Sequence, residues 1–383
     1  MTAVSESAVP FPVPDYRFDQ KNEVFKRAAW DEALRPLAQR FYTDIVYQER
    51  AGYRQEDYAL RNASWHLEWG SGFGNSRSNS GLYSWDEVSP KLRPYLDRAT
   101  RIQGDPLRLT RLVKEGARFL GADLVGVASV HPHWVYSHEY DLIAREHRPF
   151  ELPEGCHRAV VVALAMDYEA MRSSPTALAG AATGLGYSRM AYVAHLLAVF
   201  IRGLGYKALP SGNDTALSVP LAMAAGLGEA GRMGLLITER FGPRVRLCKV
   251  FTDMPLVADS FRPFGVWEFC RTCKTCAHHC PSRAIPDGEP TPVGPNVSSH
   301  SGIRKWYVNG EKCFEYWAQN RQDCAVCIRV CPFNKAPGLL HDLVRTTVKH
   351  TSKFNPFFVR MDRAMGYDRM IPASVYWRRR GVG

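Results

Sequence analysis

The stretch FCRTCKTCAHHCPSRAI, residues 269–285, decides the fold of one part of this chain. Its cysteines follow the spacing C-x2-C-x2-C-x3-C-P, which is typical of [4Fe–4S] ligation. A second run, KCFEYWAQNRQDCAVCIRVCPFNK at residues 312–335, also ends in CxxxCP. Short gaps bring three thiolates to one cluster, while the cysteine before each proline reaches the other cluster. The two runs therefore predict two [4Fe–4S] clusters and the transfer of single electrons.

This rule predicts two sets of four ligands. The first set is Cys270, Cys273, Cys276 and Cys331, and the second is Cys313, Cys324, Cys327 and Cys280. Arg321 stands where a regular second run would begin, so Cys313 completes its set through a longer loop. Structural zinc also uses CxxC pairs, but it does not explain two CxxxCP endings. The remaining cysteines, Cys156 and Cys248, are expected to be small buried hydrophobic residues.

The overall composition is that of a basic globular protein. The 383 residues are 45% hydrophobic and carry a net charge of +11, spread along the chain. Such a charge suits nucleic acid, an anionic membrane or an acidic electron donor; a solvated basic surface is the expectation, without nucleic-acid binding. We see no apolar run of membrane-spanning length, no secretory signal and no twin-arginine motif. The expected location is the cytoplasm, unless a leader has been trimmed.

Hydrophobic periodicity divides the chain into four segments: 1–105, an aromatic-rich extension with an irregular loop at 64–81; 106–265, a core; 266–340, a cysteine-rich module; and 341–383, a basic tail that wraps around. Within the core, the pattern predicts helices at 107–120, 188–204 and 217–225. It predicts strands at 123–130, 158–166, 233–238 and 245–252. This mixture indicates an α+β fold, with an α/β sandwich as its core.

One nucleotide-binding pattern is misleading. Gly226, Gly228 and Gly231 satisfy GxGxxG. A dinucleotide-binding fingerprint follows a strand and opens a helix, whereas this one follows the helix expected at 217–225. We therefore exclude nicotinamide binding and expect a loop whose backbone can approach a large ligand closely.

From about Ala122 to Lys335, the chain resembles the corrinoid-dependent reductive dehalogenases. The matching stretches include GYSRMAY (186–192), IRGLGYKALPSGNDTALSVPLA (201–222) and AGLGEAGRMGLLITERFGPRVRLCKVFTDMPL (225–256), followed in order by both cysteine runs. The resemblance implies a nitroreductase-like core that binds cobalamin as a base-off corrinoid, beside a ferredoxin-like module with two [4Fe–4S] clusters. It implies removal of halide from an organohalide, with a separate ferredoxin or flavodoxin-like electron donor. Ser211, Gly212 and the three loop glycines are the expected corrinoid contacts.

The resemblance also implies catalytic residues. The tyrosine of GYSRM is Tyr187, the asparagine of PSGND is Asn213, and the arginine of GPRVRL is Arg246. Loss of halide leaves an electron-rich carbon that must take a proton, which a phenol can supply. A guanidinium nearby favours the phenolate, and an amide can orient the phenol or the leaving halogen. Tyr192 is the rival donor, although its helical spacing predicts a core position.

Two alternatives remain at this point. An epoxyqueuosine reductase shares these cofactors and acts on tRNA, but that family has an aspartate where this chain has Tyr187. An iron–sulfur electron carrier would explain the cysteines, but it would not need residues 106–265. Aromatic residues expected to line a substrate pocket are Trp65, Trp69, Phe73 and Trp306. The organohalide, the atom that cobalt attacks and the oligomeric state are left open.

Overall fold

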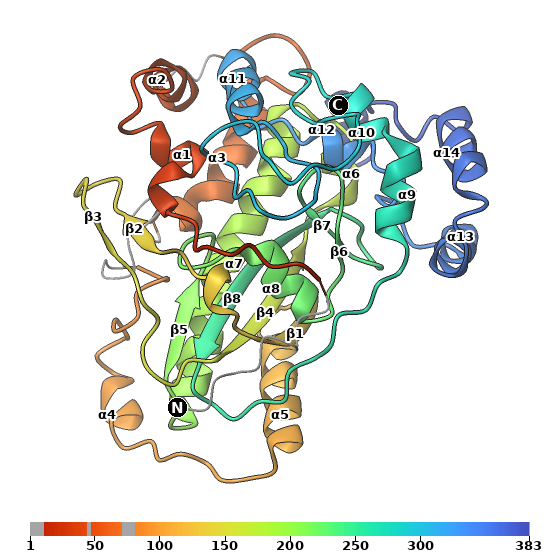
Figure 1. Ribbon diagram of the computed structural model, residues 1–383. Helices are drawn as coiled ribbons and strands as arrows, with labels where there is room; N and C mark the ends of the chain where they lie inside the picture. Colours follow the sequence, from red (N-terminus) through yellow and green to blue (C-terminus); the bar gives the residue numbers. More distant parts are fainter. Residues whose placement is uncertain (1–10, 44–46, 71–80, 383) are drawn as a thin grey trace.

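The computed structural model describes residues 11–43, 47–70 and 81–382. Its centre is an antiparallel four-stranded sheet in the order β1–β4–β8–β5 (Figure 1). These strands are β1 (Leu124–Ser129), β4 (Arg158–Ala165), β5 (Ala208–Ser211) and β8 (Val245–Thr252). Two smaller pairs are β2 (His138–Tyr140) with β3 (His147–Pro149), and β6 (Glu229–Ala230) with β7 (Leu236–Ile237). The mixed helix-and-sheet class expected from the sequence is confirmed.

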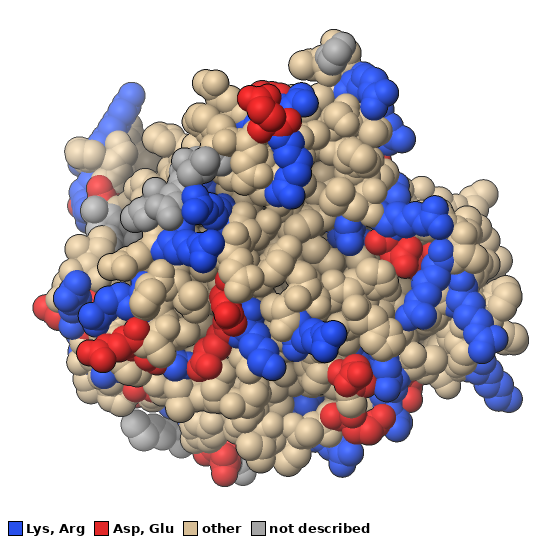
Figure 2. Space-filling model, turned by 90° about the horizontal axis from the view of Figure 1, so that it is seen from above, with Lys and Arg blue, Asp and Glu red and all other residues tan. Residues whose placement is uncertain are grey.

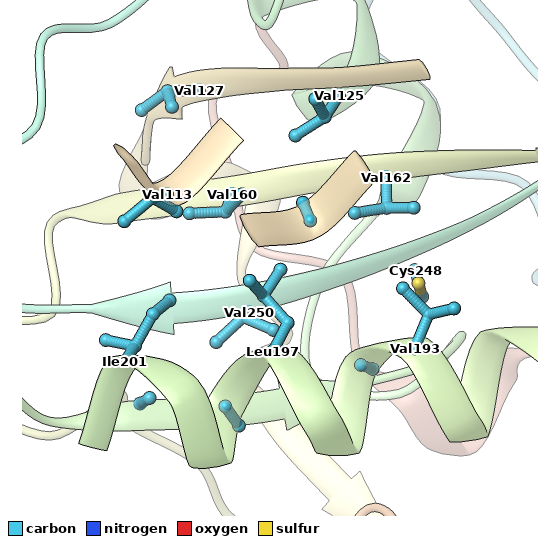
Figure 3. Packing of buried hydrophobic residues seen from close by; sticks show 14 of the residues in the cluster. Val113, Val125, Val127, Val160, Val162, Val193, Leu197, Ile201, Cys248 and Val250 are labelled. Carbon is cyan, nitrogen blue, oxygen red and sulfur yellow. The ribbon is translucent and has the colours of Figure 1, made fainter. Parts of the chain in front are cut away.

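Strand β4 is buried on both faces, as its nearly continuous apolar sequence predicts. Val160 and Val162 point to a core shared with α5 (Pro106–Phe119) and α7 (Ala177–Gly203), whereas Val161 points to the opposite core beside α8 (Ser218–Ala224). Figure 3 shows the first core, where Val193, Leu197 and Ile201 of α7 face the sheet. Helices therefore cover both faces of the sheet.

Helix α7 begins eleven residues earlier than the helix expected at 188–204. Its first half, Ala177–Gly186, is rich in glycine and alanine and almost entirely buried, so it has no polar face and no apolar stripe to reveal it. The helix is also apolar and long enough to span a membrane, contrary to the expectation from the sequence. However, 56% of its apolar window is buried inside the protein, where it forms core.

The irregular loop expected at 64–81 is also wrong in part. Residues 64–70 complete helix α3 (Gln55–Gly70), which packs along α7, and residues 71–80 lie outside the described residues. The expected strand at 233–238 shrinks to the two residues of β7. In contrast, the strands expected at 123–130, 158–166 and 245–252 and the helices at 107–120 and 217–225 are confirmed within two residues.

The cysteine-rich part lies at the end of the sheet away from α4 and α5 (Figure 1). Its helices are α9 (Val266–Cys273), α10 (Thr275–His278), α11 (Gly310–Asn320) and α12 (Val326–Arg329). Helices α13 (Leu339–His350), α14 (Asn355–Ala364) and α15 (Ala373–Arg378) follow it. The N-terminal part supplies η2 (Gln20–Asn22), α1 (Val24–Arg27), α2 (Arg35–Thr43) and α4 (Arg93–Leu96), and η3 (Pro132–Trp134) lies before β2.

Candidate active site and cysteine groups

Eight cysteines gather in two groups of four. All ten cysteines of the chain are described, and each is a free thiol. Burial raises the pKa of Cys331, and the thiols of Cys270, Cys273 and Cys276 raise it further. Burial likewise raises the pKa of Cys313 to about 12, with added contributions from Cys327 and Cys280. The thiol neighbours of Cys324 are Cys327, Cys313 and Cys280. The structure thus brings together the same two sets that the spacing predicts.

These thiols fit iron–sulfur clusters. Four neighbouring thiols would repel one another as thiolates and form few hydrogen bonds as thiols, so their gathering is explained by metal ions that replace the protons. Polar groups already surround the sulfurs, since the backbone N–H of Ala284 donates to Cys280 Sγ at 3.3 Å. The two groups are neighbours, because Cys327 contributes to the raised pKa of Cys276. The leftover Cys156 and Cys248 are buried in the two cores of the sheet, as expected.

The second group lies toward Tyr187. The guanidinium of Arg246, on β8, lies close enough to Cys327 to lower its pKa, against the larger effect of burial. The same guanidinium lies over the ring of Tyr187, 4.8 Å from its centroid. Arg246 therefore lies near both the second cysteine group and the tyrosine.

Tyr187, Asn213 and Arg246 meet, although they come from three elements. The Nδ2 of Asn213 donates a hydrogen bond to the Tyr187 hydroxyl at 3.1 Å. Gly186 precedes Tyr187 in the middle of α7, where a Cβ would lie 2.8 Å from Arg246 Cγ. A side chain at position 186 would therefore push Arg246 away from the tyrosine ring. The Nε of Arg246 is buried and has no hydrogen-bond partner among the described residues, which suits a site that receives a polar ligand.

Trp65 of α3 forms one wall of this site. Its ring stacks on Tyr187 with centroids 4.9 Å apart, and its Nε1 donates to the carbonyl of Gly180 at 3.1 Å. Gly184 permits this contact, because a Cβ there would lie 2.2 Å from the indole ring. Trp69 stacks on Trp65 at 6.0 Å. Two of the four expected pocket aromatics are therefore at the tyrosine.

The other aromatic expectations have different outcomes. Trp306 is buried among the residues around the first cysteine group, where its Nε1 donates to Gly288 O. Phe73 lies outside the described residues. Tyr192, expected in the core, is 48% exposed, because it lies on the side of α7 that faces away from the sheet. It therefore does not share the surroundings of Tyr187.

The N-terminal segment supplies a wall that the sequence did not reveal. Burial raises the pKa of the Tyr42 hydroxyl, and the nearby groups Glu23 and Tyr187 add to the shift, yet Tyr42 keeps 50% of its surface accessible. Burial lowers the pKa of Lys26, partly offset by the carboxylates of Glu23 and Asp214. Charged side chains of α1 and its cap therefore face the loop that carries Asn213. No motif marks these residues.

Lys249 holds that loop in place from the opposite face of β8. It is fully buried, and its Nζ donates to the carbonyls of Gly212, Asp214 and Ala216, the last two at 3.0 Å, and to Ser218 Oγ at 3.1 Å. Burial lowers the pKa of Lys249 to about 8. No motif in the sequence indicates this role, because a lysine within a strand has no pattern of its own.

The residues expected to contact a corrinoid are mostly packed against protein. Ser211 Oγ donates to Asp214 O at 3.0 Å, and a Cβ at Gly212 would lie 2.9 Å from the Tyr83 ring. Gly226 has a φ of +71° beside Ser260, while Gly228 and Gly231 pack on Ile237. These contacts explain why glycines occupy the loop. Direct contact between these five residues and a corrinoid stays a prediction.

Comparison with known proteins adds two family matches. The model of a reductive dehalogenase subunit matches residues 149–256, and that of a 4Fe-4S dicluster domain matches residues 269–335. The chain is 36% identical to the tetrachloroethene reductive dehalogenase of Sulfurospirillum multivorans, over 97% of this chain and 80% of that protein. It is 38% identical to the enzyme of the same name from Desulfitobacterium hafniense, over 70% of this chain and 56% of that protein. The chain thus spans little more than half of the second relative.

Solved structures agree on the fold. The catabolic reductive dehalogenase NpRdhA superposes with a TM-score of 0.71 at 23% identity, over 94% of this chain and 48% of that chain. A reductive dehalogenase solved for a mechanism of B12-dependent dehalogenation superposes with a TM-score of 0.63 at 25% identity, over 73% and 40%. The epoxyqueuosine reductase of Pseudomonas aeruginosa is 29% identical over 60% of this chain and 70% of that protein, which is a more distant relationship than that to the dehalogenases above.

Proposed function

Because this chain belongs to the reductive dehalogenase family, we propose that it removes halide from an organohalide with Tyr187 as the proton donor. Electrons would pass through two [4Fe–4S] clusters, held by the two cysteine groups, to a corrinoid. The observation that carries the proposal is the meeting of Tyr187, Asn213 and Arg246 next to Cys327 of the second cysteine group.

The cofactors of the family are a corrinoid and iron–sulfur clusters. The residues present fit both, since eight thiols form two groups, and the buried Nε of Arg246, beside the half-buried Tyr187, has no hydrogen-bond partner in the part of the chain that the structure describes. When bound and reduced, the corrinoid supplies the electrons that break the carbon–halogen bond. The sequence has no DxHxxG motif to provide a lower histidine ligand, which agrees with base-off binding.

The protein's own task is to deliver one proton. The net reaction consumes two electrons and one proton, and converts a carbon–halogen bond into a carbon–hydrogen bond and a halide ion. Since the Asn213 amide donates to the Tyr187 oxygen, the hydroxyl hydrogen points elsewhere and is available to the substrate. The charge of Arg246 then stabilises the phenolate that remains. Trp65 fixes the plane of the ring.

The electrons would come from a separate protein. We infer a small ferredoxin or flavodoxin-like donor, and a location in the cytoplasm, where such donors are reduced. Immunodetection of the chain in fractionated cells tests the location: recovery with the periplasmic fraction would contradict it.

The function is tested by comparing two tyrosines of one helix. The variants Tyr187→Phe and Tyr192→Phe are loaded anaerobically with corrinoid, and their iron and cobalt contents are measured. Turnover is then followed as halide release from a panel of chloro- and bromo-organics, with reduced methyl viologen as electron source. We expect both variants to hold the wild-type amounts of iron and cobalt. Loss of the proton donor should slow Tyr187→Phe by about 100-fold or more, whereas Tyr192→Phe should keep its rate.

Two outcomes would contradict the proposal. Wild-type turnover by Tyr187→Phe would remove the tyrosine from the mechanism. A wild-type chain that holds iron but no cobalt after loading would favour the electron-carrier alternative.

A further inference from the structure

We propose that α13 and α14 form the docking surface for the protein that donates electrons, and that this donor is a small acidic one-electron carrier. The inference rests on the proposed function, because it assumes that electrons enter at the first cysteine group. We call this surface the α13–α14 face and define it by Leu339, Leu343, Lys353, Phe357 and Arg360, which are all exposed.

The α13–α14 face is unusually apolar for a surface. Leu339, Leu343 and Phe357 are 90%, 64% and 59% exposed. Beside them lies a groove lined by Leu340, Val344, Phe358, Met361 and Met365. Clusters of exposed apolar side chains on one surface mark sites of association.

The face lies directly over the first cysteine group. Val348 of α13 and Val359 of α14 belong to a buried cluster that contains all four cysteines of the first group, together with Cys324 of the second. Arg363, at the end of α14, reaches the carbonyl of Cys273 at 3.5 Å and Thr275 Oγ1 at 3.3 Å. The second group, in contrast, adjoins Arg246 in the active site. A donor bound to this face would therefore lie next to the first cysteine group, which is the more distant of the two groups from Tyr187.

Charge favours an acidic occupant. Residues 341–383 contain nine lysines and arginines and three aspartates, so this small part of the chain carries six of the eleven net positive charges. Of the aspartates, Asp362 is buried and pairs with Lys335 at 2.6 Å, and Asp342 pairs with Arg345. Within the described ranges, no carboxylate pairs with Lys353, Arg360 or Arg363. In Figure 2, blue side chains gather at the right of the view, on the side where Figure 1 places α9, α13 and α14.

An apolar centre with a cationic rim suits a transient encounter. Charges steer such partners together, and a small contact area lets them part after each electron. A second copy of this chain would bring the same positive charge to the contact, which opposes a symmetric dimer through this face. Each encounter would oxidise the donor by one electron and reduce the first cluster by one, so two encounters serve one halide released.

The test separates a protein donor from a small-molecule donor. Clusters of the loaded enzyme are reduced anaerobically in a stopped-flow instrument, either by a reduced acidic two-cluster ferredoxin or by reduced methyl viologen, and bleaching of their absorbance is recorded. The variant Lys353→Glu/Arg360→Glu reverses the rim charge, and Phe357→Ser removes an apolar contact. The control Lys91→Glu/Arg111→Glu makes the same change of net charge at exposed sites before and within α5, near the opposite end of the molecule.

At low ionic strength we expect the rim variant to slow reduction by ferredoxin at least about tenfold, since steering of this size is common for charged partners. The difference should shrink as salt is added, and Phe357→Ser should slow reduction at every salt concentration. The rate of cluster reduction by methyl viologen should stay within about twofold of the wild-type rate in all variants. The rate of reduction of the control by ferredoxin should also stay within about twofold of the wild-type rate.

Several results would overturn the proposal. Unchanged ferredoxin rates in both face variants would do so, as would an equal loss in the control. The face would instead bind a second copy of the chain if two results were found together. The wild type would sediment as a dimer, and Phe357→Ser would sediment as a monomer with an unchanged rate of reduction by ferredoxin. Flotation of the wild type with vesicles of anionic lipid, together with unchanged ferredoxin rates, would assign it to a membrane. The rate of cluster reduction is measured without an organohalide. The docking proposal can therefore be tested even if the protein shows no dehalogenase activity.

Discussion

At the scale of single residues, the proposed proton donor Tyr187 depends on its neighbours for its position. Asn213 orients the phenol, and Asn213 is itself carried by a loop whose carbonyls converge on Lys249. The ammonium of Lys249 has four acceptors within reach, which is more than its three hydrogens can serve at once. All of its hydrogens can therefore be donated to this segment, which anchors the loop to the core. Lys249 is therefore a positioning residue.

Lys249→Met should lower kcat more than it raises KM, because the loop loses its anchor while the substrate wall at Trp65 is unchanged. The pKa of Lys249 is lowered to about 8, so the wild type should lose activity as pH rises through about 8 and the ammonium is deprotonated. The variant should lack this alkaline limb. The measurement is the pH profile of kcat with methyl viologen as donor. A variant with a wild-type profile would show that Lys249 serves folding alone.

At the scale of elements, α3 and α7 form the frame that holds the aromatic wall against Tyr187. The sequence predicted strands β1, β4 and β8 of the sheet well, because their apolar runs are bounded by clear breaks, but it did not predict the short strand β5. It predicted α7 poorly, because Gly180 and Gly184 do not contribute to an apolar stripe. Their lack of a side chain lets residues 322–323 and Trp65 approach the helix closely. It also missed the last turns of α3, where Trp65 stacks on Tyr187 and Trp69 stacks on Trp65 instead of forming a repeating core face.

The α3–α7 contact contains a buried acid with a measurable pH signature. Glu68 accepts a hydrogen bond from Tyr83 at 3.2 Å, and burial raises its pKa to about 8. The folded state therefore keeps a proton that the unfolded chain releases between about pH 4.5 and 8, so stability should fall as pH rises through that window. Glu68→Gln should remove this part of the pH dependence and raise the melting temperature at pH 8 to 9.

The measurement is the melting temperature of the loaded protein at several pH values. The control is Glu56→Gln, at an exposed position in the first turn of the same helix. Parallel curves for the wild type and Glu68→Gln would contradict the assignment.

At the scale of the whole molecule, the first cysteine group adjoins α14 and the second lies near Arg246 and Tyr187. The cysteine spacing alone predicted which eight thiols would gather and how they would divide, because the reach of a short loop is a local property. The N-terminal wall at Glu23, Lys26 and Tyr42 could not be predicted, since it depends on a return of the chain over a core formed more than a hundred residues later.

Cys313 is the ligand that the spacing placed least directly, and its substitution tests the division into two groups. Cys313→Ser should impair the second cluster and leave the first, lowering iron from about eight per chain toward about four. Electron paramagnetic resonance of the reduced protein should lose the interaction between two clusters. Cys156→Ser, which changes a buried cysteine outside both groups, serves as the control and should keep full iron. Full iron in Cys313→Ser would assign the fourth ligand elsewhere.

The N-terminal wall also sets an order of assembly. The segment before α3 is synthesised before the residues that it contacts: Arg17 contacts Val135 O, Lys26 interacts with Asp214, and Tyr16 contacts His300. It must therefore wait, without its partners, while the sheet and the cysteine module are synthesised and folded. During that interval the surroundings of Tyr187 lack the side chain of Tyr42. The N-terminal side of the site around Tyr187 is therefore completed only after the residues that it contacts have been synthesised and folded.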